Sequence, residues 1–442
     1  MFPLFLILLL SLFVFYSIRV MLKRDHDLHA LAFLTLYIYT VFAQIGYVYF
    51  PELSQLYGVY YGQTLFYKYW TFMFLSFLFT FLLYLKINPK GQKKQSYLVK
   101  PTSRNYGEYI FYSIVILLYV VLNLYFRQYR GLFEYGGGNS LGGPWFGIGF
   151  WMFTLCSLIL YTLFRDISNT LRKRIFSFLL FLFCATFFLQ VTIAAGTRSS
   201  ILYFFISIAF FELTPLMKTI KYNKRKIFTF ILACSLLFSI LSSLRTLRVQ
   251  GEDIDFSSIA NYDSTESRFA FEEFSASILL QDYYLPSHTL FASMQYNIVD
   301  PFEVIKSNLA NSLIGIDYPL LTIIIVEKAT GITDERGAGW AYHYFVEGYN
   351  AIGFLGIFYN ALFWNLGMLL WIWLSQSNNI IHNRAILSIS ALVIMIVMRS
   401  QTSAFIQFYW LILLSGSVLL LLANNSSVAF LRKMRPINKR DE

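Results

Sequence analysis

Three arginines next to predicted helix ends, together with Arg336, are the residues of this sequence best suited to bind phosphate. Arg198 follows Gly196 in the sequence Gly-Thr-Arg-Ser-Ser, and Arg399 precedes the sequence Ser-Gln-Thr-Ser. Arg268 and Arg336 lie between these two positions. A guanidinium group engages phosphate oxygens through paired hydrogen bonds, and the free N–H groups of a helix N-terminus favour an anion. We therefore expect a phosphate or pyrophosphate site. The simpler alternative is that each arginine extends from a helix end toward water or pairs with a carboxylate.

Candidate acids and bases accompany these arginines. His343 and Glu347 are four residues apart, so on a helix they share one face. Glu272 and Glu273 follow Arg268 at helical spacing. Each of these side chains could accept a proton from a hydroxyl group, or orient a neighbouring arginine. Each could equally form an ordinary helix-surface pair. An HxxxE pair alone is not a metal motif, so we expect no metal and no cofactor.

The composition places these residues in a membrane protein. Of the 442 residues 57% are hydrophobic and 13% are charged, whereas a soluble chain has about 25% charged residues. The three cysteines, Cys156, Cys184 and Cys234, lie in apolar runs and suggest neither a disulfide framework nor a metal site. Runs of roughly 20 apolar residues predict an all-α bundle of about eleven transmembrane helices. The predicted spans are residues 2–22, 28–50, 64–86, 107–126, 145–164, 175–195, 199–217, 227–244, 346–374, 385–398 and 404–423.

The basic residues predict how the bundle is oriented. Segments that follow odd-numbered spans carry 23 of the 35 Lys and Arg residues, and the opposite segments carry ten. Cytoplasmic loops are enriched in basic residues, so the N-terminus is expected outside and the C-terminus in the cytoplasm. The net charge of +11 then reflects topology, and no nucleic-acid partner is expected. Eight of the ten external basic residues are Arg, compared with 10 of the 23 internal ones, which suits phosphate binding outside.

One segment is much longer than the other connections. We expect residues 1–442 to form a single transmembrane domain, with residues 245–341 as a large external loop. Within it, residues 268–284 have apolar side chains at helical spacing and could lie along the membrane surface. Residues 316–326 are apolar but too short to span, which favours a re-entrant or interfacial segment. The chain has no phosphate-binding P-loop, dinucleotide fingerprint or nucleophile elbow, so any substrate must arrive already activated.

Three short motifs resemble bacterial oligosaccharide repeat-unit polymerases of the Wzy type, which build O-antigen, capsule and enterobacterial common antigen. These motifs are the Gly-Thr-Arg-Ser-Ser turn at 196–200, the glycine-punctuated stretch at 337–356, and Arg399 after a late short span. The resemblance in topology covers nearly the whole chain.

The resemblance implies a GT-C-like membrane glycosyltransferase that needs no nucleotide. Such an enzyme transfers a growing glycan from one undecaprenyl pyrophosphate to the terminal sugar of another lipid-linked repeat unit, at the outer face of the cytoplasmic membrane. The implied partners are these lipid-linked donor and acceptor oligosaccharides, the lipid bilayer and a chain-length regulator protein. Two alternatives stay open: an O-antigen ligase, which shares the topology, and a flippase for lipid-linked oligosaccharides. The spans carry almost no charges, which argues against the flippase.

Overall fold

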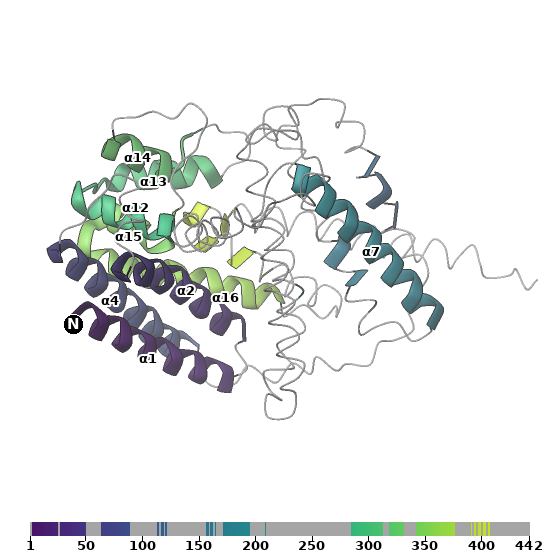
Figure 1. The fold of residues 1–442 in the computed structure, drawn as a ribbon, viewed down its shortest axis with the longest axis horizontal. Coiled ribbons are helices and arrows are strands. Elements are labelled where there is room, and N and C mark those ends of the chain that lie inside the picture. The colour runs from purple at the N-terminus through teal and green to yellow at the C-terminus, as the bar shows by residue number, and fades with distance from the viewer. Residues whose placement is uncertain are drawn as a thin grey trace, which may run out of the picture. The chain divides into compact units, whose positions relative to one another are not determined.

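The computed structural model describes about half of the chain. The described residues are 2–24, 27–49, 63–88, 171–194, 284–312, 318–330, 342–375 and 401–403, with scattered positions within 113–121, 156–164, 390–398 and 405–406, and residue 208. Every regular element in these parts is helical, as an all-α fold requires. Figure 1 shows the helices α1 (Phe2–Lys23), α2 (Asp27–Tyr49), α4 (Gln63–Ile87), α7 (Leu171–Ala194), α12 (Tyr284–Gln295), α13 (Pro301–Ser312), α14 (Leu321–Thr330), α15 (Tyr344–Ile352), the 3-10 turn η4 (Gly353–Leu355) and α16 (Gly356–Ser375).

Three helical segments are long and apolar enough to cross a membrane: Leu4–Lys23, Thr64–Ile87 and Tyr344–Trp371. They coincide with three of the predicted spans, and the protein is therefore a membrane protein. Two further predicted spans correspond to α2 and α7, which contain the shorter apolar stretches Leu28–Val41 and Arg174–Phe183. The other predicted spans fall largely or wholly outside the described residues and stay predictions.

The chain forms two compact units. One comprises residues 1–94, 209–372 and 391–407, and the other comprises residues 95–208, 373–390 and 408–442. In the second unit, α7 packs through Phe178 and Phe181 against Phe164 and Tyr161, with ring centroids 5.0 Å apart in both pairs. Its other side presents Leu179 and further large apolar side chains outward. The candidate site lies in the first unit.

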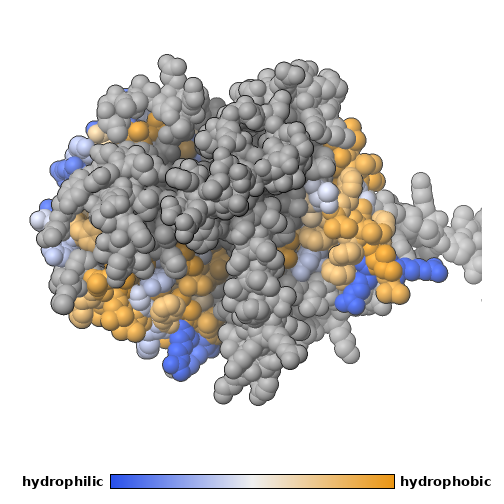
Figure 2. Space-filling view, viewed as in Figure 1, coloured by the Kyte–Doolittle hydropathy of each residue, from blue (hydrophilic) through white to orange (hydrophobic). Residues whose placement is uncertain are grey.

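The first unit is built around α2, which contacts α1 on one side and α12 on the other. In α1, Leu10 and Val14 are fully buried while Leu8 and Leu12 are exposed, so one stripe faces the bundle and the other faces outward. Figure 2 shows exposed hydrophobic side chains gathered over this region of the unit. Apolar residues on an outer surface are stable when lipid, rather than water, surrounds them. The outer stripe of α1 therefore marks a lipid-facing surface.

The predicted span at 346–374 is divided by a break at Gly353. Gly353 ends α15 with φ 63°, a backbone conformation that favours glycine. Beyond the break, α16 buries Ile357, Ala361 and Trp364, while Phe358 and Leu362 are exposed. The two helices also approach closely, because a Cβ at Gly348 would lie only 2.4 Å from the Gly356 carbonyl oxygen. Only glycine at position 348 permits this contact. The short helix α15 is thus buried inside the unit, and α16 presents one side to lipid.

The long segment at 245–341 contributes three helices to the first unit. α12 contacts α2, α4 and α15, and all its residues from Ser287 to Met294 are buried. α13 contacts both α14 and α15. The apolar segment expected at 316–326 overlaps α14, a helix of 10 residues. Most of the described part of this segment therefore packs into the bundle, while residues 268–284 lie almost entirely outside the described residues.

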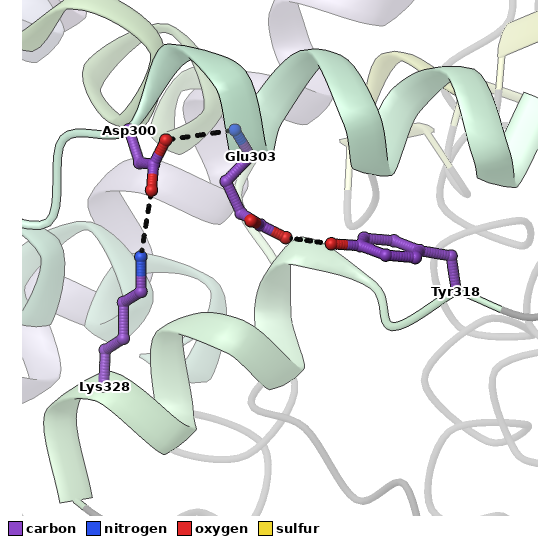
Figure 3. Close-up of polar contacts among 4 residues, drawn as sticks. All are labelled: Asp300, Glu303, Tyr318 and Lys328. Atoms are coloured by element: carbon purple, nitrogen blue, oxygen red, sulfur yellow. Dashed lines mark hydrogen bonds and ion pairs between the residues drawn. The ribbon is translucent and has the colours of Figure 1, made fainter.

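The first turn of α13 shows why the chain becomes helical there (Figure 3). Asp300 precedes the helix, and its carboxylate accepts a hydrogen bond of 3.0 Å from the backbone N–H of Glu303. Pro301 at the first helical position loses nothing by lacking an N–H group. The other carboxylate oxygen of Asp300 lies 3.4 Å from Lys328 Nζ on α14, and the Tyr318 hydroxyl donates to Glu303. These contacts fix the start of α13 against α14.

Candidate functional site

Glu347 is the charged side chain at the centre of the site. It lies in the first turn of α15 and is completely buried. Its Oε1 atom accepts hydrogen bonds from Asn308 Nδ2 (2.8 Å) and from the Tyr359 hydroxyl (2.5 Å). Its Oε2 atom accepts the backbone N–H of Thr402 at 2.6 Å. Three donors from three elements therefore converge on one carboxylate, an arrangement that fits its ionised form, which only accepts hydrogen bonds.

The donor from Thr402 belongs to the N-terminus of another helical segment. Residues 402, 403, 405 and 406 are helical, so the N–H groups of Thr402 and Ser403 have no partner within their own helix. Glu347 accepts the first, and Asn308 Oδ1 accepts the second at 3.0 Å. The positive end of a helix stabilises a nearby negative charge. This contact partly offsets the free-energy cost of burying the negative charge of Glu347. Among the described residues, no cation pairs with this carboxylate.

Gln401 holds the same helix start against α13 and α14. Its Oε1 atom accepts the backbone N–H of Leu321 at 2.9 Å, and its Nε2 atom donates to Ser307 and Ser403. Ser307 in turn donates to the Pro319 carbonyl oxygen. All of these are polar contacts in a buried region, where an unmade hydrogen bond would cost about 1–3 kcal/mol per group. The donors around Glu347 are therefore held in place by a second set of hydrogen bonds.

His343 is held by contacts different from those of Glu347. It caps the N-terminus of α15, with its Nδ1 atom accepting the backbone N–H of Phe345 at 3.1 Å. Its Nε2 atom lies 3.0 Å from Thr40 Oγ1 on α2, and Thr40 itself donates to the Leu36 carbonyl. The neutral ring therefore carries its proton on Nε2 and donates it to Thr40. Burial lowers the pKa of His343 to about 3, so the ring stays neutral at physiological pH.

Several further buried polar groups lie near Glu347. They are the hydroxyl groups of Tyr342 and Tyr344, the side-chain amide of Asn350 and the hydroxyl of Thr402. Tyr342 lies beside Asn350, and Tyr344 lies beside Thr402, so these groups face one another in pairs. Buried polar groups in folded proteins are nearly always satisfied, and these pairs extend the polar region around the carboxylate.

A buried amide on α16 fixes the turn of α15 that carries Glu347. Asn360 Oδ1 accepts the N–H of Gly348 at 3.1 Å, and its Nδ2 atom donates to the Phe345 carbonyl oxygen at 3.0 Å. One side chain thus bonds to the backbone on both sides of Glu347. Asn365, one turn further along, donates to the Thr80 carbonyl oxygen of α4. These two asparagines hold the broken helix in the bundle.

The described residues contain two of the eight residues predicted for the site. Glu347 and His343 lie together at the start of α15, within the first unit. Outside the described residues lie the predicted phosphate-binding arginines Arg198, Arg268, Arg336 and Arg399, and the predicted carboxylates Glu272 and Glu273. Those six assignments stay predictions. No cluster of metal-ligating side chains occurs among the residues that the structure describes.

The sequence did not predict the residues that donate to Glu347, namely Asn308, Tyr359 and Thr402. A signal existed for the buried amides, because asparagine is costly in an apolar span unless it is paired, and Asn360 and Asn365 lie in the span at 346–374. For Asn308, the signal was the pattern of Asp300, Pro301 and Glu303, which is typical of a helix start and predicts a helix that includes Asn308.

Comparison with known proteins finds no matching family model, no matching curated protein and no matching solved structure.

Proposed function

We propose that this protein is a membrane glycosyltransferase that polymerises undecaprenyl-pyrophosphate-linked oligosaccharide repeat units at the outer face of the cytoplasmic membrane. The observation that carries the proposal is the buried Glu347 carboxylate. Asn308, Tyr359 and Thr402 hold its two oxygens in place by hydrogen bonds. A carboxylate held rigidly by such donors is positioned to take the proton of an acceptor hydroxyl.

In the proposed reaction, the acceptor sugar hydroxyl gives its proton to Glu347. Its oxygen attacks the anomeric carbon of the donor glycan and forms the new glycosidic bond. The bond between that carbon and the pyrophosphate oxygen breaks, and undecaprenyl pyrophosphate leaves with the electron pair. Negative charge develops on the leaving pyrophosphate, and guanidinium groups placed beforehand would stabilise it. We assign this role to Arg198, Arg268, Arg336 and Arg399; Arg399 precedes Thr402, a donor to Glu347, by three residues.

The geometry favours Glu347 over His343 as the base. Both ring nitrogens of His343 already have partners, and accepting a proton at Nδ1 would break the cap of α15. The polar groups of Tyr342, Tyr344 and Asn350 near Glu347 are of a kind that can also bind a ligand rich in hydroxyl groups, such as a sugar. Glu272 and Glu273 keep the supporting role of orienting Arg268. No step in this scheme needs a metal or another cofactor.

The proposal is tested with Glu347→Gln in protein reconstituted in proteoliposomes with a lipid-linked repeat unit. Glu327→Gln on α14 is the matched control, because Glu327 is exposed and lies outside the site. Removing a general base slows a reaction by about 10²–10⁴-fold. We expect polymer from the wild type and from Glu327→Gln, and a loss of that size for Glu347→Gln. Normal polymerisation by Glu347→Gln would contradict the assignment of the base.

The Gln variant also needs a stability control. The Thr402 N–H group and the Asn308 amide both donate to the carboxylate, so a Gln side chain must direct its NH₂ group at one of these donors. The resulting mismatch costs about 1–3 kcal/mol. Thermal unfolding of both variants in detergent therefore accompanies the assay. A Glu347→Gln protein that is folded at the assay temperature and inactive supports a catalytic role. One that regains activity whenever it is folded supports a purely structural role as a helix cap.

A lipid-linked oligosaccharide flippase is the second candidate, because of the break at Gly353. Transporters place their sites at discontinuous helices whose ends face the substrate, and α15 is a short buried helix of this kind. The same proteoliposomes separate the candidates. A polymerase lengthens the glycan on one leaflet, whereas a flippase moves an unchanged repeat unit across the bilayer. An O-antigen ligase would form its product only when a lipid A core acceptor is added.

A further inference from the structure

The helix α13 exposes large apolar side chains that a helix at a water-exposed surface would bury. Phe302, Ile305 and Leu309 are spaced along one face and have exposed fractions of 85%, 56% and 63%. The inner side carries Val304 together with the polar residues Ser307 and Asn308, whose side chains bond to Gln401 and Glu347. A surface helix in water shows the opposite arrangement, with apolar residues inward and polar residues outward.

The apolar face of α13 continues into the surface of a membrane-spanning helix. Val299, which precedes α13, lies against Gly353 at the break between α15 and α16, within 3.9 Å of where a Cβ would stand. The N–H group of Asp300 donates to the Asn350 carbonyl oxygen at 2.7 Å, which fixes this position. On the other side of the break, Phe354, Leu355 and Phe358 are also exposed. One exposed apolar surface therefore runs from the outer side of α16 to the start of α13.

The polar groups of α13 lie along the edges of this face. Lys306 is exposed, and its Nζ atom lies 4.5 Å from the centre of the Tyr318 ring. The interaction with the Tyr318 hydroxyl raises the pKa of Lys306, so it is cationic at neutral pH. Glu303 and Asp300 face α14 through Tyr318 and Lys328 (Figure 3). A lysine beside an apolar face is typical of a helix at the membrane surface, where the ammonium group reaches lipid phosphates.

We propose that α13 lies in one leaflet of the bilayer, with Phe302, Ile305 and Leu309 among the acyl chains and Lys306 at the level of the headgroups. At 12 residues the helix is about 18 Å long, too short to cross the hydrocarbon region. The bound partner is the lipid itself. The inner face of the same helix carries Asn308, so a lipid-contacting helix forms part of the wall around Glu347. This inference depends on the membrane location of the protein and is independent of its proposed activity.

Spin labels test this placement in proteoliposomes. Cysteine is introduced singly at Phe302, Ile305 and Leu309 in a variant whose native cysteines, Cys156, Cys184 and Cys234, are replaced by alanine. Leu362 on α16 is the lipid-facing control, and Glu327 on α14 is the water-facing control; both are exposed. Power saturation then compares the accessibility of each label to oxygen, which concentrates in lipid, with that to a water-soluble nickel complex.

We expect labels at 302, 305 and 309 to match the label at 362, with an oxygen-to-nickel ratio severalfold above that at 327. A ratio equal to that at 327 would place the face in water and overturn the proposal. Labels shielded from both reagents would show that protein covers the face, either a partner or a second copy, and would also overturn it.

A second measurement uses protein that retains its native cysteines. Ile305→Glu and Glu327→Gln are compared by thermal unfolding in proteoliposomes. A carboxylate on a lipid-facing position is destabilising, so we expect Ile305→Glu alone to lower the midpoint of unfolding. An unchanged midpoint for Ile305→Glu would contradict the lipid contact, because water tolerates a glutamate at that position.

Discussion

At the scale of single residues, the donors to Glu347 differ from the other buried polar groups around it. Tyr359 donates directly to the carboxylate at 2.5 Å, whereas the hydroxyl of Tyr344 lies beside the neutral side chain of Thr402. Hydrogen bonds to charged groups contribute about 1.5–3 kcal/mol, while bonds between neutral groups contribute about 0.5–1.5 kcal/mol. The two tyrosines are therefore expected to contribute unequally to stability.

This contrast gives a matched pair of substitutions. We expect Tyr359→Phe to lower the free energy of unfolding by about 1.5–3 kcal/mol, because it leaves Glu347 with fewer donors. We expect Tyr344→Phe to lower it less, by at most about 1.5 kcal/mol, because the neighbouring Thr402 side chain is neutral. Thermal unfolding of both variants in the same detergent measures the difference. Equal effects of the two substitutions would show that the contact between Tyr359 and Glu347 adds no more stability than a bond between neutral groups.

At this scale the sequence predicted Glu347 as a candidate residue but did not predict its hydrogen-bond partners. The spacing of His343 and Glu347 was visible, and both residues occupy the start of α15. The carboxylate partners come from residues 39 positions before it and 55 positions after it. Such contacts depend on how the helices pack, which a local pattern does not record. The cap formed by His343 was missed for another reason, because histidine is not among the residues that usually cap a helix.

At the scale of elements, α13 depends on the cap formed by Asp300. The N–H group of Glu303, and secondarily Lys328, holds the pKa of the Asp300 carboxyl below its ordinary value. A carboxyl group with a lowered pKa in the folded state stabilises that state above its unfolded pKa, near 4. That stabilisation is lost as the pH falls through the folded pKa. The start of α13 should therefore loosen in acid.

Hydrogen exchange of residues 301–312 at neutral and acidic pH, corrected for intrinsic rates, tests this expectation. In the wild type we expect protection of α13 to fall below pH 4. Asp300→Asn retains a capping oxygen but does not titrate, so its protection should depend less on pH. Asp300→Ala should show low protection at every pH. Protection that falls equally in the wild type and in Asp300→Asn would assign the acid effect to another group.

The elements divide clearly into those that the sequence predicted and those that it did not. Long apolar runs predicted α1, α4 and the segment at 344–371, since each shows the length that a bilayer requires. The break at Gly353 was not predicted, because glycine is common in membrane helices and hydropathy does not record a positive φ. α12 was missed because it buries polar residues, Ser287, His288, Thr289 and Ser293, together with Leu290, Phe291 and Met294, and so has no one-sided apolar pattern.

At the scale of the whole molecule, the C-terminal ends of α1 and α4 lie on the same side of the first unit. Arg24 at the end of α1 donates to the carbonyl oxygen of Asn88, which follows α4, at 3.1 Å. Lys23 and Lys86, in the last turns of the same helices, also lie at this end. The distribution of basic residues predicts that this side is cytoplasmic. Ser287 of α12 and His343, which caps α15, contact α2 at Tyr39 and Thr40, in the half of α2 that is farther along the chain from Arg24, so the candidate site is expected toward the outside.

Labelling with a membrane-impermeant maleimide tests this orientation in intact cells. Single cysteines replace Lys86 and Glu327, both of which are exposed, in the variant without native cysteines. We expect labelling at 327 in intact cells and labelling at 86 only after the membrane is permeabilised. The reverse pattern would invert the topology and place Glu347 toward the cytoplasm. That result would exclude a polymerase that works outside.

Asn308 has a consequence for how related sequences should vary. Its amide nitrogen donates to Glu347 while its oxygen accepts from Ser403, so the side chain must offer a donor and an acceptor in two fixed directions. Aspartate would set a second negative charge against Glu347, and leucine would leave both neighbours unsatisfied. Positions 308 and 347 should therefore be exchanged together, as a coevolving pair, in any lineage that keeps this arrangement of helices.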